Sequence, residues 1–108
     1  MKREIFVTTD FEAIHWWPDA PDSEAFLRHP HCHIFKVKVW AEVQHNDRDI
    51  EFINFKHWLD CYIAERARFN QDNVGSCESM AEFLLYPRNE ITKVSVSEDG
   101  ENGAVITK

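Results

Sequence analysis

Four segments of the chain have the residue pattern of β-strands, either an alternation of hydrophobic and polar residues or an enrichment in β-branched and aromatic ones. The first segment, residues 4–17, is rich in β-branched and aromatic residues and stops at the turn-forming sequence PDAPDS. The second runs from His33, through the alternating apolar residues Phe35, Val37 and Val39, to the polar turn HNDRD. The last two, EITKVSVSEDG and GAVITK, flank the turn EDGENG and predict a closing hairpin.

Two segments between the second and third predicted strands have helical periodicity. In residues 51–69, five apolar residues recur at helical spacing: Phe55, Trp58, Leu59, Tyr62 and Ile63. Asn54 is available to cap this helix. The second segment, residues 75–86, has Ser76 as its N-cap and stops before Pro87. Three of its apolar residues are expected on one face: Met80, Phe83 and Leu84.

The resulting order is β-β-α-α-β-β, which predicts an α+β fold. We expect a four-stranded antiparallel sheet with two helices inserted between strands 2 and 3. A chain of 108 residues with 44% hydrophobic residues is expected to form one folded domain, residues 1–108, around a single core. No repeat, linker or low-complexity tract interrupts it.

Composition narrows the classes of partner. The net charge of −7, from 19 acidic and 12 basic residues, disfavours a surface that neutralises nucleic-acid phosphates and favours a small-molecule ligand. No apolar run approaches the roughly 20 residues that span a bilayer, and the N-terminal sequence lacks a secretory pattern, so a cytoplasmic protein without membrane contact is expected. The three cysteines, Cys32, Cys61 and Cys77, have no CxxC spacing and are expected to be free thiols.

Histidines concentrate in the stretch RHPHCHIFKVKVWAEV, residues 28–43. On a strand, His31 and His33 point to one face and Cys32 to the other. His15, near the end of the first strand, lies across the turn if the two strands pair, and three imidazoles with one open position form a catalytic Zn²⁺ site. His29 could cap the metal, support a ligand or occupy the turn. The alternative is a polar turn that is rich in histidine.

Five motifs in the same order resemble those of one enzyme family. FEAIH, residues 11–15, resembles its F-x-A-x-H, and HCHIFKVKV resembles its H-G-H followed by a strand. FINFKHWLD is similar to the family's D-F-x-x-L-K, although Asn54 stands where aspartate is usual. SCESMAEFL is similar to its T-x-E-N-x-A, and VSVSEDGENGAVI is similar to its V-x-V-x-E-T. These motifs, which span nearly the whole chain, resemble the 6-pyruvoyl tetrahydropterin synthase and 6-carboxytetrahydropterin synthase family, whose domains have the tunnelling fold.

The resemblance implies a zinc site, a heterocycle site and an oligomer. Its zinc ligands map onto His15, His31 and His33, and its pterin-anchoring glutamate maps onto Glu98, with Glu78 assisting. It implies a zinc-dependent lyase-like reaction on a reduced pterin or purine-like heterocycle, as in 7-deazaguanine (queuosine-type) biosynthesis. It also implies a homo-oligomer, a trimer or hexamer, in which Glu98 meets the histidines across a subunit boundary. The alternative for Glu98 is a solvated residue of a charged turn.

The chain departs from the family at the groups that transfer protons. Leu27 stands near the expected cysteine, and residues 66–75 lack the family's Asp-His pair. Candidate replacements are Cys77, whose thiolate the helix N-terminus would favour, and His57 on the first helix, with Asp60 and Asp72 as weaker ones. The protein is therefore expected to be an enzyme with altered acid-base groups, or a non-catalytic zinc-containing binding module. A scaffold with incidental histidines is the third option.

Overall fold

An antiparallel four-stranded sheet forms the centre of the molecule. The computed structural model describes residues 1–67, 69 and 72–108. The strands lie in the order of the chain and are β1 (Arg3–His15), β2 (His31–Val43), β3 (Ile91–Glu98) and β4 (Asn102–Thr107). The predicted α+β class, the antiparallel pairing and the order β-β-α-α-β-β are confirmed.

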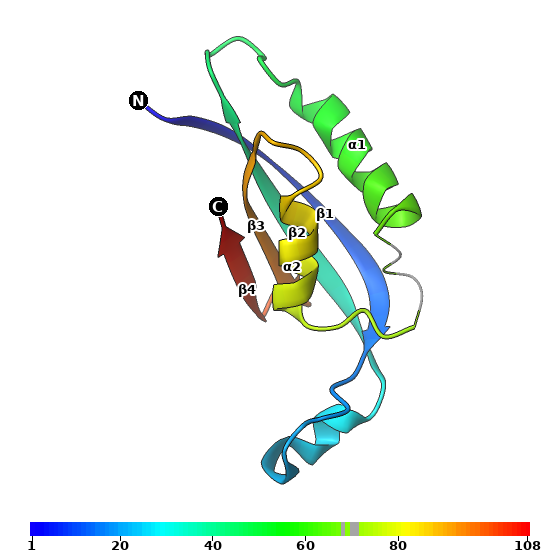
Figure 1. The fold of residues 1–108 in the computed structure, drawn as a ribbon. Coiled ribbons are helices and arrows are strands. Elements are labelled where there is room, and N and C mark those ends of the chain that lie inside the picture. Colours follow the sequence, from blue (N-terminus) through cyan, green and yellow to red (C-terminus); the bar gives the residue numbers. More distant parts are fainter. Residues whose placement is uncertain (68, 70–71) are drawn as a thin grey trace.

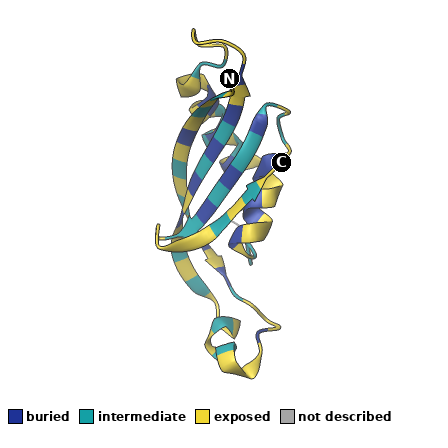
Figure 2. Ribbon diagram, turned by 90° about the vertical axis from the view of Figure 1, so that its left-hand side faces the viewer, coloured by how far each residue is buried: buried dark blue, intermediate teal, exposed yellow. Residues whose placement is uncertain are grey.

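Both α-helices cover the same face of the sheet (Figure 1). Helix α1 (Phe52–Glu65) lies against β1, and α2 (Cys77–Leu85) lies against β3 and β4. Side chains from β2 and both helices fill the space between sheet and helices, and each is at most 2% exposed: Phe35, Val37, Val39, Phe55, Leu59, Met80 and Leu84. Figure 2 shows the alternation of buried and exposed residues along the strands that this packing requires.

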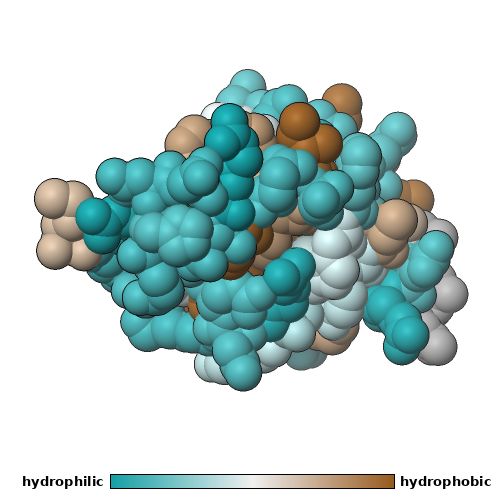
Figure 3. All heavy atoms as spheres, turned by 90° about the horizontal axis from the view of Figure 1, so that it is seen from above, coloured by the Kyte–Doolittle hydropathy of each residue, from teal (hydrophilic) through white to brown (hydrophobic). Residues whose placement is uncertain are grey.

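On the opposite face of the sheet, no helix formed by the described residues packs against the strands (Figure 1). It exposes several large apolar side chains: Phe6, Ile14, Ile34 and Val105. Lys38 lies over the ring of Phe6, with its ammonium nitrogen 4.1 Å from the ring centroid. The end of the molecule that carries the β2–α1 connection, seen from above in Figure 3, is mostly hydrophilic with separate apolar side chains. None of the helices in the described ranges has the length and apolar character that a membrane crossing requires.

Residues 16–30 form an arm that projects beyond the sheet at the end of β1 (Figure 1). The sequence predicted only a loop here, but the arm contains a 3-10 helix, η1 (Asp22–Arg28). Its two legs are joined by a hydrogen bond from the backbone N–H of Trp17 to the carbonyl of Leu27, 2.7 Å long. The arm therefore holds its own shape next to the predicted metal ligands.

Two local expectations about the helices are wrong. The N-cap of α1 is Glu51, whose carboxylate accepts hydrogen bonds from the backbone N–H groups of Ile53 and Asn54, so Asn54 is capped rather than capping. Phe83 is 46% exposed and does not share the buried face of α2. The predicted cap at Ser76 is confirmed, because its hydroxyl accepts from the N–H of Ser79.

Candidate metal centre

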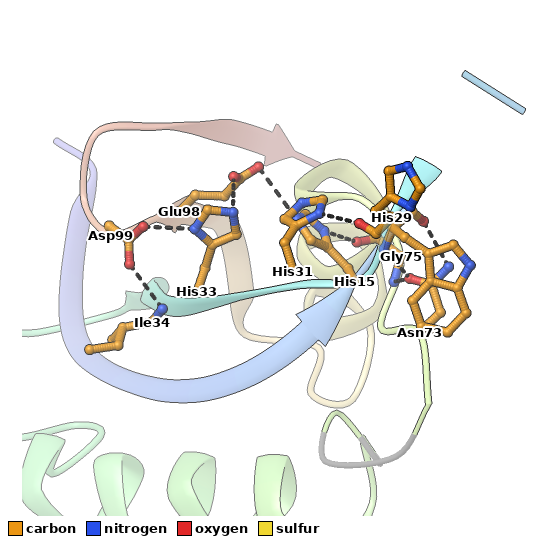
Figure 4. Close-up of polar contacts among 10 residues, drawn as sticks. His15, His29, His31, His33, Ile34, Asn73, Gly75, Glu98 and Asp99 are labelled. Carbon is orange, nitrogen blue, oxygen red and sulfur yellow. Dashed lines mark hydrogen bonds and ion pairs between the residues drawn. The ribbon is translucent and has the colours of Figure 1, made fainter. Parts of the chain in front are cut away.

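The pairing of β1 with β2 brings three histidine rings together at one end of the sheet (Figure 4). His15 is opposite His31, and Ala13 is opposite His33, so the strand alternation turns all three rings to the helix-covered side. The centroid of the His15 ring lies 4.4 Å from that of His31 and 5.4 Å from that of His33. One nitrogen of each ring lies within 4.8 Å of the other two, close enough to hold a metal ion.

Each ring uses its Nδ1 atom for a hydrogen bond to an oxygen. His15 Nδ1 lies 2.8 Å from the carbonyl of Gly75, and His31 Nδ1 lies 2.8 Å from the carbonyl of His29. His33 Nδ1 lies 2.7 Å from a carboxylate oxygen of Asp99. Because these oxygens accept, each Nδ1 carries a proton, and in the neutral form of each ring Nε2 is left with a lone pair. This is the arrangement that partner groups impose on metal-binding histidines.

A buried atom without a partner tests whether these residues fit a metal. His15 is only 9% exposed, and its Nε2 atom is buried without a hydrogen-bond partner. Leaving such an atom unsatisfied costs about 1–3 kcal/mol, which a bound cation would offset. Three imidazole nitrogens suit zinc, copper, iron or nickel, so the residues fit a transition metal and the donor set alone does not identify it.

Glu98 reaches the histidines from β3 within the same chain. Its carboxylate oxygens lie 2.9 Å from His33 Nε2 and 3.8 Å from His15 Nε2. The expectation that Glu98 meets these rings only across a subunit boundary is wrong, because antiparallel pairing of β2 with β3 already places Glu98 opposite Phe35, two residues from His33. Glu98 is thus part of the site rather than a solvated turn residue.

A cleft of about 690 Å³ adjoins the rings of His15 and His31. The arm contributes apolar side chains to it: Trp16, Trp17, Pro18 and Leu27. The start of α2 contributes Cys77 and Glu78. The tryptophans were not singled out from the sequence, although two adjacent tryptophans directly after His15 are a signal that was available. Leu27, which the resemblance places near the family's cysteine, supplies apolar surface to the cleft.

The loop that precedes α2 fixes the ring of His15. The Asn73 side chain accepts hydrogen bonds from the N–H groups of Trp16 and Gly75, both 3.1 Å long, and donates one of 2.8 Å to the carbonyl of Trp16. The N–H of Val74 donates to the carbonyl of Ile14, so the loop runs alongside the end of β1. Gly75 has a φ of +85°, a conformation that glycine adopts easily. Sequence reasoning missed Asn73, which no periodic pattern indicates.

The thiol of Cys77 lines the cleft, but its surroundings disfavour the thiolate. Burial raises its pKa to about 11, and the negative charges of Glu98 and Glu78 contribute to the rise. The expectation that the N-terminus of α2 favours a thiolate is therefore wrong, because burial and the two carboxylates outweigh the helix dipole. Cys32 is exposed on the opposite face from the histidines, as predicted.

His57 lies on α1 in a part of the helix that is beside the middle of β1. It is exposed on α1, and the neighbouring Lys56 donates to the carbonyl of Thr8, seven residues before His15. That separation along a strand is roughly 20 Å, so His57 cannot act at the histidine cluster of its own chain. Asp60 accepts a hydrogen bond from Thr9 in the same region, which also separates it from the site. Asp72 is exposed and does not line the cleft of the histidines.

The chain matches no family model and no curated protein. The resemblance to the pterin synthase family therefore stays a prediction that rests on the motifs.

Proposed function

We propose that this protein is a zinc-dependent lyase-like enzyme that acts on a reduced pterin or a related purine-like heterocycle, similar to 6-carboxytetrahydropterin synthase. The observation that carries the proposal is the convergence of one nitrogen from each of three histidine rings beside a carboxylate and an open cleft. A catalytic site needs a path by which a ligand reaches the metal, and the cleft beside His15 and His31 provides one. A volume of about 690 Å³ is also within the usual range for small-molecule sites.

Each part of the site has a task in this proposal. His15, His31 and His33 would hold the zinc ion, which when bound supplies Lewis acidity toward a hydroxyl or keto oxygen of the ligand. The carboxylate of Glu98 can accept two parallel hydrogen bonds from a guanidine-like pyrimidine edge, and Glu78 is a second acceptor in the cleft. The rings of Trp16 and Trp17 offer flat apolar surface to a heterocycle and exclude water from one side.

Proton transfer divides the enzyme from the second candidate, a non-catalytic binding module. A thiol with a pKa of about 11 can donate a proton at neutral pH but does not accept one. Cys77 would therefore act as the acid and Glu78 as the base of an altered pair. Two observations favour the binding module. The raised pKa of Cys77 removes the thiolate as a base, and among the described residues no histidine other than the proposed metal ligands lines the cleft to replace it.

We also propose that the chain assembles into a homo-oligomer, by resemblance a trimer or hexamer. The outer edges of β1 and β4 have no neighbouring strand in the described part of the chain, so their backbone groups can pair with another copy. The helix-free face exposes Phe6, Ile34 and Val105, which a second copy would cover. Sedimentation of the purified protein measures this assembly.

Metal analysis and turnover test the proposal together. We expect about one zinc ion per chain in the wild type, near-complete loss in His31→Ala, and an unchanged content in His57→Ala, the matched control on α1. The wild type is then incubated with dihydroneopterin triphosphate. Loss of the side chain from the ring supports the enzyme, whereas ring binding without product supports the module. Equal metal in His31→Ala and the wild type would contradict both.

A further inference from the structure

The carboxylate of Glu98 lines the cleft and at the same time reaches the histidine rings, where its oxygens contact His33 and His15 (Figure 4). We propose that Glu98 is itself a ligand of the metal in the resting protein and closes the coordination sphere that the three histidines leave open. A heterocycle then has to draw Glu98 away before it can approach the metal. This second step rests on the proposed function, whereas the first step does not.

The distances fit a ligand. A tetrahedral zinc ion, with bonds of about 2.0–2.1 Å to nitrogen and oxygen, places neighbouring ligand atoms about 3.3–3.4 Å apart. The oxygens of Glu98 lie 2.9 Å from His33 Nε2 and 3.8 Å from His15 Nε2, on either side of that value. The group whose ligand atoms all lie within 4.8 Å of one another comprises the three histidines alone, so the carboxylate has to rotate toward the ion to complete its coordination.

The charges point the same way. His33 donates from Nδ1 to Asp99, so a neutral His33 ring presents a lone pair at Nε2. A carboxylate oxygen also presents lone pairs, and two acceptors 2.9 Å apart repel each other unless a positive charge lies between them. A proton on His33 would satisfy that contact alone. A metal ion would also satisfy the buried Nε2 of His15, which has no partner.

The consequence is a centre that is closed until a ligand with the right chemistry arrives. Four protein ligands without an open position are typical of structural zinc sites, and an open position is typical of catalytic ones. An amidine or guanidine-like edge donates two parallel hydrogen bonds, which can replace the bond that a carboxylate makes to the metal. The same contact would thus anchor the ring and open the metal.

Cobalt tests the first step without any organic ligand. The metal-free protein is titrated with Co²⁺, and its visible absorption spectrum and affinity are compared in the wild type, Glu98→Gln and Glu78→Gln. We expect Glu98→Gln to change the spectrum and to weaken Co²⁺ binding at least tenfold. We also expect thiocyanate, added as an external ligand, to bind the cobalt ion in Glu98→Gln but not in the wild type. Glu78→Gln, which removes a carboxylate from the same cleft, should match the wild type.

Glu98→Asp extends this test in case Glu98→Gln does not fold. The shorter side chain keeps the charge but withdraws the oxygens, so we expect an altered spectrum and access for thiocyanate. Spectra and affinities equal to the wild type in the folded variants would overturn the proposal.

Neopterin tests the second step, because it carries the same aminopyrimidinone edge. Added to the cobalt-loaded wild type, it should shift the spectrum toward that of Glu98→Gln. Binding seen by its fluorescence without a spectral shift would overturn the displacement of Glu98. No binding at all would count against the proposed function, while the assignment of Glu98 as a ligand would stand on the cobalt titration.

Discussion

His15 and His33 lie on neighbouring strands and both bond an oxygen through Nδ1, yet different parts of the molecule fix them (Figure 4). His15 is 9% exposed and donates to the backbone carbonyl of Gly75, 60 residues further along the chain. His33 is more exposed and donates to the side chain of Asp99 in the β3–β4 turn. On the buried side of the site a backbone carbonyl thus holds the histidine ring, whereas on the exposed side a charged carboxylate holds it.

This difference separates two effects on a bound metal: the orientation of a histidine ring and the strength with which the ring donates electrons. A backbone carbonyl in a fixed loop restricts where the His15 ring can point and adds no net charge. A carboxylate can rotate, but its negative charge makes the His33 ring a stronger electron donor. The hydrogen bonds from His33 and from the backbone N–H of Ile34 lower the pKa of Asp99, so Asp99 keeps this charge at neutral pH. Disturbing the two sides should therefore affect the metal to different degrees.

The largest effect is expected from Asn73→Ala on the His15 side. The change leaves the N–H and carbonyl of Trp16 and the N–H of Gly75 without their partner. We expect a loss of about 2 kcal/mol in the free energy of unfolding and a fall of about 100-fold in zinc affinity. Urea unfolding of the metal-free protein and competition with a chelator measure the two quantities.

Asn46→Ala is the matched control for that variant. The side-chain amide oxygen of Asn46 accepts a hydrogen bond from the guanidinium of Arg3 at an exposed turn away from the histidines. Its loss should change stability by less than about 0.5 kcal/mol and leave zinc affinity as it was. If Asn73→Ala destabilises the fold but binds zinc as tightly as the wild type, the loop does not position His15 and the comparison fails on that side.

A smaller effect is expected from Asp99→Asn on the His33 side. Asp99 has a φ of +57°, which asparagine also tolerates, and the amide oxygen can still accept from His33 Nδ1. The charge is removed, and the backbone N–H of Ile34 loses its acceptor because the second carboxylate oxygen becomes an NH2 group. We expect zinc affinity to fall about tenfold, at the lower end for such partners. Chelator competition on this variant and on Glu101→Gln, in the same exposed turn, measures the difference. A loss as large as that of Asn73→Ala would show that charge and geometry contribute equally.

The sequence predicted the ligands better than the groups that hold them. Strand alternation predicted that His31 and His33 share a face, and pairing of the first two strands predicted that His15 joins them. The first prediction follows from the two-residue period of a strand, and the second follows from the short connection between the first two strands. The supports of the rings, Asn73 and Asp99, lie in non-periodic segments more than 50 residues away, and Asp99 is in a left-handed conformation. Nothing in the alternation of residues predicts such contacts.

The same limit applies to the fold around the site. Apolar periodicity predicted both α-helices and all four strands, because each buries one regular face. It did not predict η1 in the arm, where Phe26 is 69% exposed and no regular face is buried. It also gave no direction for the side chain of Glu98, which has to be read from its distances to His15 and His33.

The smallest effect is expected at Cys77, two residues after Gly75 on the His15 side. With a pKa of about 11, roughly one thiol in 3,000 is ionised at pH 7.5. In a Cys32→Ser/Cys61→Ser variant, alkylation of Cys77 by iodoacetamide should therefore be slow and should rise about tenfold per pH unit up to pH 9.5 without a plateau. Mass spectrometry measures the rates. A plateau below pH 9 would mean that the thiolate forms readily, and the His15 side would then supply a base as well as a support.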